Sequence, residues 1–127
     1  MTAKITVMVV DDHRILREGI SALLSATGEI EVIAQADNGR DAVRLARSES
    51  PDIILIDPSL PLLNGVEASR QIKREAPCCR IIALSNLEDE EIIRKMLAAG
   101  AMGYLTKDTG QEELIQAVQR AYETSQQ

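Results

Sequence analysis

Side chains able to bind a cation or a phosphoryl group stand at or just after the ends of four short apolar runs. Charged groups are costly beside a hydrophobic core unless something compensates them. In a sheet of parallel strands, ligand sites lie beyond the carboxyl ends of the strands, so these side chains are candidates for one shared site. They are Asp11 and Asp12 after residues 5–10, Asp57 at the end of 52–57, Ser85 at the end of 80–85, and Lys107 after 102–106.

The carboxylates of this group favour a hard cation over a naked phosphate. The turn "DDHRILREG" (11–19) carries negative charge where phosphate-binding turns have glycines that let backbone N–H groups approach an anion. Oxygen ligands suit Mg²⁺, which takes a few protein carboxylates and keeps several waters. A bound Mg²⁺, with Lys107 and Ser85, would orient a phosphoryl group toward Asp57, the candidate nucleophile because it ends the central strand.

Each of these residues also has a simpler interpretation when it is considered alone. Asp11 or Asp12 can cap a helix, and Asp57 before a proline can belong to an ordinary turn. Ser85 can bond nearby backbone, and Lys107 can be a solvated surface lysine. The conjunction of complementary groups at four separate strand ends favours a single site over these separate roles.

Histidine, tyrosine and cysteine do not suggest a second reactive centre. His13 is the only histidine and lacks a Ser or Cys partner, so it is interpreted as a helix-start residue. Tyr104, in the last predicted strand, is by default a core or rim aromatic. The adjacent cysteines Cys78 and Cys79 form no CxxC pattern and are interpreted as reduced thiols beside a strand.

Short aliphatic runs alternate with longer amphipathic stretches along the chain. The runs are bounded by polar residues, Gly or Pro, as buried parallel strands usually are. Strict alternation predicts an α/β fold in which a five-stranded parallel sheet carries helices on both faces. The predicted strands are residues 5–10, 31–36, 52–57, 80–85 and 102–106.

Start and stop signals place amphipathic helices between and after these strands. Asn and Thr are suited to helix N-caps, and Gly or Pro commonly follows a helix end. The expected helices are a stripe from Ile15 to Leu24 before Gly28, one capped by Asn38 and ended by Ser50-Pro51, one from near Gly65 to before Pro77, "EDEEIIRKMLAAG" (88–100), and one opening with Thr109 and Glu112 in capping-box spacing.

The composition describes one globular domain with an aliphatic core over residues 1–127. Apolar residues make up 45% and charged residues 27%, with no Trp or Phe and two Tyr. The net charge of −6 and the pI of about 4.8 argue against this chain alone binding nucleic acid or anionic membranes, which need clustered Lys and Arg. We found no membrane-length apolar run and no signal-peptide pattern, so a cytoplasmic location is expected.

One family shares the order and spacing of four segments: "VVDDHRILREGI", "PDIILIDPSLPLLNGVE", "IIALS" and "AGAMGYLTKD". Together they resemble the response-regulator receiver domain of two-component signalling over nearly the whole chain. "DDHRILREG" with "AGAMGYLTKD" is especially similar to the NarL/FixJ-type subfamily. The resemblance implies a flavodoxin-like (βα)₅ three-layer sandwich with strand order 2-1-3-4-5.

The resemblance also implies a role for each acidic residue. Asp57 would accept a phosphoryl group from the phosphohistidine of a sensor histidine kinase. Asp12, Asp57 and the backbone carbonyl of Ser59 would contact Mg²⁺, and Asp11 would support the ion mainly through water. The chain would then be a phosphorylation-activated switch, one that assists its own phosphoryl transfer and hydrolysis but is not an enzyme.

By the same resemblance, the remaining residues would read out the phosphorylated state. Ser85 and Lys107 would each contact a phosphoryl oxygen, and Tyr104 would be the rotameric switch that swings inward. The surface of the fourth helix, fifth strand and fifth helix would change, favouring a homodimer or contact with an output domain. Transcription would be controlled through a C-terminal helix-turn-helix domain absent from this chain, and residues 124–127 would begin a linker or free tail.

Two departures from the family pattern bear on the rate of phosphorylation. Pro58 replaces an open-chain aliphatic residue and removes one N–H, and Asn86 stands where a small residue is frequent. Two alternatives stay open: a Mg²⁺-dependent aspartyl-phosphate hydrolase or phosphotransferase, and a degenerate receiver that only binds. Ser59 stands where such hydrolases usually have a second acid, and the intact acidic set argues against a degenerate receiver.

Overall fold

Strands and helices alternate strictly along the chain in the computed structural model, which describes residues 3–86 and 89–125. The predicted βα alternation is therefore confirmed. The elements are β1 (Ile5–Val10), α1 (Arg14–Ser25), β2 (Ile30–Ala36), α2 (Gly39–Glu49), β3 (Ile53–Ile56), α3 (Gly65–Glu75), β4 (Arg80–Ser85), α4 (Glu90–Ala98), β5 (Gly103–Thr106) and α5 (Gln111–Ser125).

The strands form a single parallel sheet in the order β2-β1-β3-β4-β5. This is the flavodoxin-like topology that the resemblance implied, and that prediction is confirmed. β2 lies on one side of β1 and β3 lies on the other, so the strand order reverses between β1 and β3. Val10 of β1 lies opposite Ile56 of β3. The carboxyl ends of these two strands therefore meet at the topological switch point, where ligands bind in such sheets.

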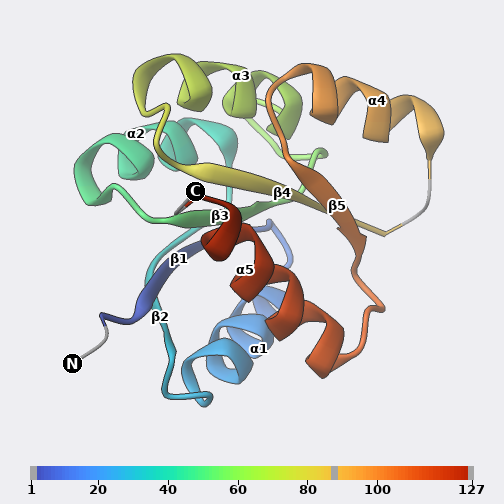
Figure 1. The fold of residues 1–127 in the computed structure, drawn as a ribbon. Helices are drawn as coiled ribbons and strands as arrows, with labels where there is room; N and C mark the ends of the chain where they lie inside the picture. Colours follow the sequence, from blue (N-terminus) through green and yellow to red (C-terminus); the bar gives the residue numbers. More distant parts are fainter. Residues whose placement is uncertain (1–2, 87–88, 126–127) are drawn as a thin grey trace.

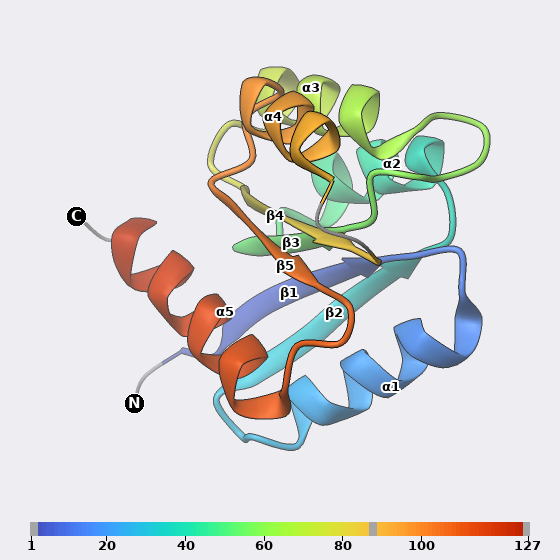
Figure 2. The ribbon, with the colours of Figure 1, turned by 90° about the vertical axis from the view of Figure 1, so that its right-hand side faces the viewer.

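Helices cover both faces of the sheet, so each strand is buried on two sides. In Figure 1, α2, α3 and α4 lie above the sheet, and α1 and α5 lie below it; Figure 2 shows the same layers from the side. Alternate residues of one strand enter separate cores, because side chains on a strand alternate between faces. Met8 and Val10 pack with α2 and α3, whereas Val7 and Val9 pack with α1 and α5.

The strand boundaries follow the prediction closely, with differences at polar ends. β1 and β4 have the predicted bounds, β2 begins one residue earlier, and β5 begins at Gly103. β3 is shorter than predicted at both ends: the backbone N–H of Asp52 donates to the Thr6 hydroxyl at 3.0 Å, and the strand ends at Ile56. The Asp52 side chain accepts the backbone N–H and the hydroxyl of Thr6, each at 3.0 Å. Asp57 therefore stands just beyond the strand.

The predicted helix signals are confirmed for α2 and corrected for α5. The Asn38 side chain accepts the Asp41 N–H at 2.8 Å, and Ser50 ends α2 with a φ of 47°. α5 begins at Gln111, so Thr109 is not the N-cap residue; its hydroxyl lies 3.2 Å from that of Thr106. Residue 88 of the expected fourth helix lies outside the described residues, and residues 124 and 125 of the expected tail belong to α5.

Candidate functional site

Two buried carboxylates stand side by side where β1 and β3 end. Asp11 and Asp57 directly follow the strand residues Val10 and Ile56, which lie opposite each other. The N–H of Asp57 donates to the Val10 carbonyl, and that of Asp11 to the Ala36 carbonyl, each at 3.0 Å. The ladder thus continues past both strands and holds the carboxylates at the sheet edge, with Asp11 0% and Asp57 5% exposed.

Lys107 bridges these two carboxylates. Its Nζ lies 2.6 Å from Asp57 Oδ2 and 2.7 Å from Asp11 Oδ2, and its backbone N–H donates to the Ser85 carbonyl at 2.7 Å. Burial by itself lowers the pKa of Lys107, but pairing with Asp11 and Asp57 raises it more, so the pKa lies above its ordinary value. The lysine is therefore a fixed positive charge between two acids.

The loop between β3 and α3 holds the other side of Asp57. The Ser59 N–H donates to Asp57 Oδ1 at 2.8 Å, and the Gly65 N–H donates to the Pro58 carbonyl at 2.8 Å. A Cβ at residue 65 would lie 2.0 Å from the Asp57 carbonyl oxygen, so only glycine allows α3 to start this close. Both carboxylate oxygens of Asp57 thus have a partner, which fixes their direction.

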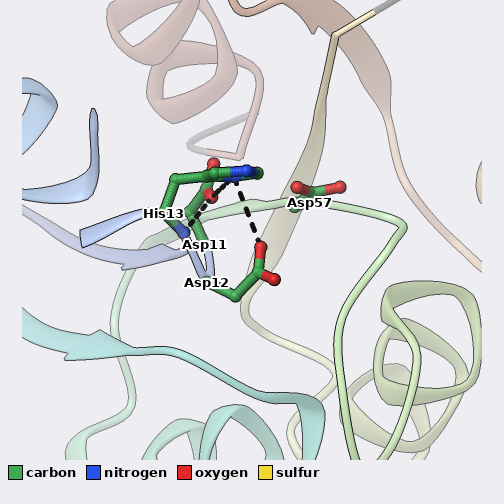
Figure 3. Close-up of side chains that lie close together, drawn as sticks. All are labelled: Asp11, Asp12, His13 and Asp57. Carbon is green, nitrogen blue, oxygen red and sulfur yellow. Dashed lines mark hydrogen bonds and ion pairs between the residues drawn. The ribbon is translucent and has the colours of Figure 1, made fainter. Parts of the chain in front are cut away.

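The turn after β1 carries Asp12 and His13 to the mouth of the same pocket. His13 is the N-cap residue of α1 but makes no side-chain capping bond. Its ring Nδ1 lies 3.0 Å from Asp11 Oδ1 and 3.4 Å from Asp12 Oδ1, and its backbone N–H donates to Asp11 Oδ1 at 2.8 Å. Figure 3 shows the ring lying over the acidic pair and reaching toward Asp57.

These positions show whether Asp11 or Asp12 serves as the N-cap of α1. Neither Asp11 nor Asp12 is the N-cap of α1, so simple capping does not explain the acidic pair. His13 does stand at the helix start, as predicted, but its side chain turns toward the carboxylates. Among the described residues, one potential ligand atom from each of Asp11, Asp12, His13 and Asp57 lies within 4.8 Å of the others.

A cavity of about 720 Å³ opens from Asp57 between the β3–α3 loop, α3 and α4. Ser85 and Asn86 line it, as do Pro58 and Ser59, so the structure gathers these predicted residues at one opening. Tyr104 is not among the described residues that line this cavity. It is 44% exposed on β5, which places the predicted switch residue in an outward position.

The charge balance of the pocket favours a cation. Asp11, Asp12 and Asp57 contribute three carboxylates, and Lys107 forms ion pairs with only two of them. The predominantly oxygen donors are the type that Mg²⁺ prefers. Two carboxylates are buried, where the repulsion between like charges is poorly screened. The site is therefore compatible with Mg²⁺, as predicted.

Two contributors to this site were not predicted from the sequence. The ring of His13 enters the acidic cluster, although its spacing indicated only a helix start. Arg17, one turn into α1, donates from Nη1 to the Asp11 carbonyl at 2.9 Å and from Nε to Gln35 Oε1 at 3.1 Å. Arg17 thereby ties the acidic turn to β2. A basic residue one helical turn after the acidic pair is the only sequence signal for this contact.

Comparison with known proteins gives this site a family. A family model described as the response regulator receiver domain matches residues 7–119. The chain belongs to this family. Among curated relatives, the response regulator GacA of Pseudomonas aeruginosa is 37% identical over 118 residues, covering 93% of this chain and 55% of GacA. The transcriptional regulatory protein DegU of Brevibacillus brevis is 39% identical over 115 residues, covering 91% of this chain and 49% of DegU.

Solved receiver structures agree with this assignment. The signal receiver domain of NarL from Mycobacterium tuberculosis superposes with a TM-score of 0.92 at 30% identity, covering 96% of this chain and 98% of that one. The LuxR-family two-component response regulator from Aurantimonas has a TM-score of 0.90 at 34% identity, covering 96% and 87% respectively. The predicted NarL/FixJ resemblance and the receiver function are confirmed.

The receiver chain spans about half the length of the curated relatives that it matches. What such a whole protein does beyond its receiver therefore stays a matter of proposal. Within the described part of this receiver, no helix is long and apolar enough to cross a membrane.

Proposed function

We propose that Asp57 is the phosphoacceptor of this receiver and that a sensor histidine kinase is its donor. The observation that carries the proposal is the fixed carboxylate of Asp57, held by Lys107 at 2.6 Å and by the Ser59 N–H at 2.8 Å at the mouth of the cavity. A carboxylate oxygen would bond to phosphorus as the P–N bond of the donor phosphohistidine breaks, giving an acyl phosphate and a free imidazole.

Asp12 and Asp57, with the backbone carbonyl of Ser59, would hold Mg²⁺, and Asp11 would support it mainly through water. The donor set fits: Asp12 is half-exposed and paired only loosely with His13 at 3.4 Å, so its oxygens are available. When bound, Mg²⁺ supplies positive charge that offsets the repulsion between the carboxylates and an incoming phosphoryl group. Lys107 and Ser85 would each contact a phosphoryl oxygen.

The proposed output surface comprises α4, β5 and α5, with Tyr104 as the switch residue. Three large apolar side chains are exposed on α4 and β5 or beside them: Leu97 at 46%, Met102 at 41% and Tyr104 at 44%. Such a group suits contact with a second copy of this chain or with an output domain. Phosphorylation adds about two negative charges, which would draw Ser85 toward the phosphate and free space for Tyr104.

We further propose that residues 1–127 are the receiver of a cytoplasmic transcription regulator. The DNA-binding step would belong to a C-terminal helix-turn-helix output domain, because the receiver itself is acidic. The product of phosphorylation would be a changed binding surface, so the domain acts as a switch and not as an enzyme. Pro58 and Asn86 line the cavity and would tune the rate of phosphorylation.

The direct test of the phosphoacceptor is mass spectrometry after incubation with acetyl phosphate and Mg²⁺. The wild type should gain one phosphoryl mass, and Asp57→Asn should not. An absent adduct in the wild type, or an undiminished adduct in the variant, contradicts the assignment. A hydrolase would instead release phosphate over many turnovers without a lasting adduct, and a degenerate receiver would form none.

Two further measurements test the cation site and the output surface. Asp12→Ala should weaken Mg²⁺ binding in a calorimetric titration, because it removes the most accessible carboxylate; an unchanged titration counts against Asp12 as a ligand. Beryllofluoride with Mg²⁺ should increase self-association in sedimentation velocity. Identical sedimentation with and without it contradicts the proposed dimer.

A further inference from the structure

The imidazole of His13 is placed as a metal ligand would be, and not as a helix cap. Its Nδ1 lies 3.0 Å from one Asp11 oxygen and 3.4 Å from one Asp12 oxygen. Two ligands bound to one ion at about 2.1 Å stand roughly 3.0–3.4 Å apart at right or tetrahedral angles. The separation of His13 Nδ1 from Asp12 Oδ1, a proposed direct ligand, therefore matches that of neighbouring ligands around a single ion.

The ring of His13 neither caps α1 nor packs in a hydrophobic core. His13 makes no side-chain capping bond at the start of α1, and its side chain is 63% exposed, so it does not serve a core. The polar contacts of its ring are with the carboxylates of Asp11 and Asp12. A potential ligand atom of His13 also lies within 4.8 Å of one from Asp57.

We infer that His13 is a specificity-determining ligand of the metal pocket, one that favours borderline transition ions such as Co²⁺, Ni²⁺ and Cu²⁺. This inference rests on the proposed cation site and extends it. Imidazole nitrogen suits these ions, whereas Mg²⁺ prefers oxygen ligands and binds through carboxylates and water. His13 should therefore raise affinity for transition ions while contributing little to Mg²⁺. The pocket then distinguishes metals through one side chain.

The test compares two metals in variants of one side chain. Untagged protein with Cys78→Ser, which removes the exposed thiol as a competing soft ligand, is titrated with Co²⁺ and separately with Mg²⁺ by calorimetry. His13→Phe keeps a ring but has no nitrogen, and His13→Asn keeps a residue suited to the N-cap position. Arg14→Gln, at the exposed neighbouring position, is the matched control.

Both His13 variants should bind Co²⁺ about tenfold more weakly, equivalent to about 1.4 kcal/mol, with Mg²⁺ affinity changed less than about twofold. Arg14→Gln should change the two affinities by a common factor. If Co²⁺ and Mg²⁺ binding fall together in the His13 variants, or if neither falls, the inference is wrong. Circular dichroism of each variant shows that it is folded, and His13→Asn decides the matter if His13→Phe is not.

Pulsed electron paramagnetic resonance of the Cu²⁺-loaded protein gives a second readout. His13 is the only histidine in the chain, so an imidazole nitrogen coupling in the wild type can come only from this residue. The coupling should disappear in His13→Phe. Its absence from the wild type overturns the inference. Failure of the phosphoacceptor proposal appears separately, as a missing acetyl phosphate adduct, whatever metal preference is measured.

Discussion

Replacing Lys107 with methionine tests how this site balances its charges. The lysine side chain is 6% exposed and contacts Asp11 and Asp57, whose side chains are 0% and 7% exposed. Methionine keeps most of the aliphatic stem but removes the ammonium group. Two carboxylates would then face each other in a buried setting without a cation, so the metal-free protein should be less stable.

The magnitude follows from the contacts that remain. Removing one partner of a buried ion pair typically costs about 3–5 kcal/mol. Here Asp57 keeps the Ser59 N–H at 2.8 Å and Asp11 keeps the His13 N–H at 2.8 Å, so part of each charge stays compensated. We therefore expect a loss of about 2–3 kcal/mol in metal-free buffer, or roughly 10 °C in melting temperature for a domain of this size.

Urea unfolding in EDTA and again in Mg²⁺ measures this loss. Mg²⁺ should narrow the difference, because a ligand that binds only the folded state stabilises it and the variant pocket is more negative. Adding Asp11→Asn to Lys107→Met should restore about 1–2 kcal/mol. Lys95→Met, at an exposed ion pair of 3.4 Å, is the matched control and should change stability by less than about 0.5 kcal/mol. A Lys107→Met variant as stable as this control refutes the reasoning.

Four other experiments test the structure near the site and elsewhere in the fold. Gly65→Ala should cost about 1–3 kcal/mol in urea unfolding because its Cβ meets backbone atoms, whereas Gly19→Ala, with open space and a helical position, should not destabilise. Leu62→Gly should raise stability by up to about 1 kcal/mol, because Leu62 is 70% exposed and has a φ of 66°; an unchanged or lower urea midpoint contradicts this. At pH 8, iodoacetamide should label the exposed Cys78 rapidly and the buried Cys79 only when the protein unfolds. Mass spectrometry counts the labels on each molecule, and rapid addition of two labels to the folded protein contradicts the burial of Cys79. Burial raises the pKa of the Cys79 thiol above its usual value. The stabilising contribution of the protonated thiol is therefore complete below the pKa of the unfolded chain and is lost as the pH rises through the raised pKa. Cys79→Ala should lack this decline in urea titrations.

The fold was predictable because its pattern is local and repeated. Five aliphatic runs alternate with amphipathic stretches, and parallel βα units connect in one hand. The predicted bounds failed where polar side chains compete for backbone groups. Asp52 bonds Thr6 instead of extending β3, and α5 begins after Gly110 and not after Thr109. The contact of Asp52 with Thr6 joins residues that are distant in sequence, which a local pattern does not contain, whereas Thr109 instead contacts the nearby Thr106.

The carboxylates and the lysine of the site were predictable, but the roles of His13 and Arg17 and the contacts between the side chains were not. Parallel strands bring their carboxyl ends to one edge, so Asp11, Asp57 and Lys107 had to lie near one another once the sheet was assigned. The direction of the His13 ring depends on a side-chain rotation that no spacing encodes. The contact of Arg17 with the Asp11 carbonyl also depends on how α1 packs against β2. The side-chain orientations of His13 and Arg17 were therefore known only from the structure.

Lys107 connects the charge of the acidic pocket to the strand that carries the proposed switch. Its ammonium lies 2.6 Å from Asp57, and its backbone N–H donates to Ser85 at 2.7 Å. Tyr104 stands three residues earlier on the same segment, opposite Ala83 of β4. If Asp57 is phosphorylated, the lysine must re-pair with the new anion, and Ser85 lies next to both changes. A charge change at one strand end would thus act directly on β4 and β5, so the proposed switch would need no longer path to the exposed Tyr104.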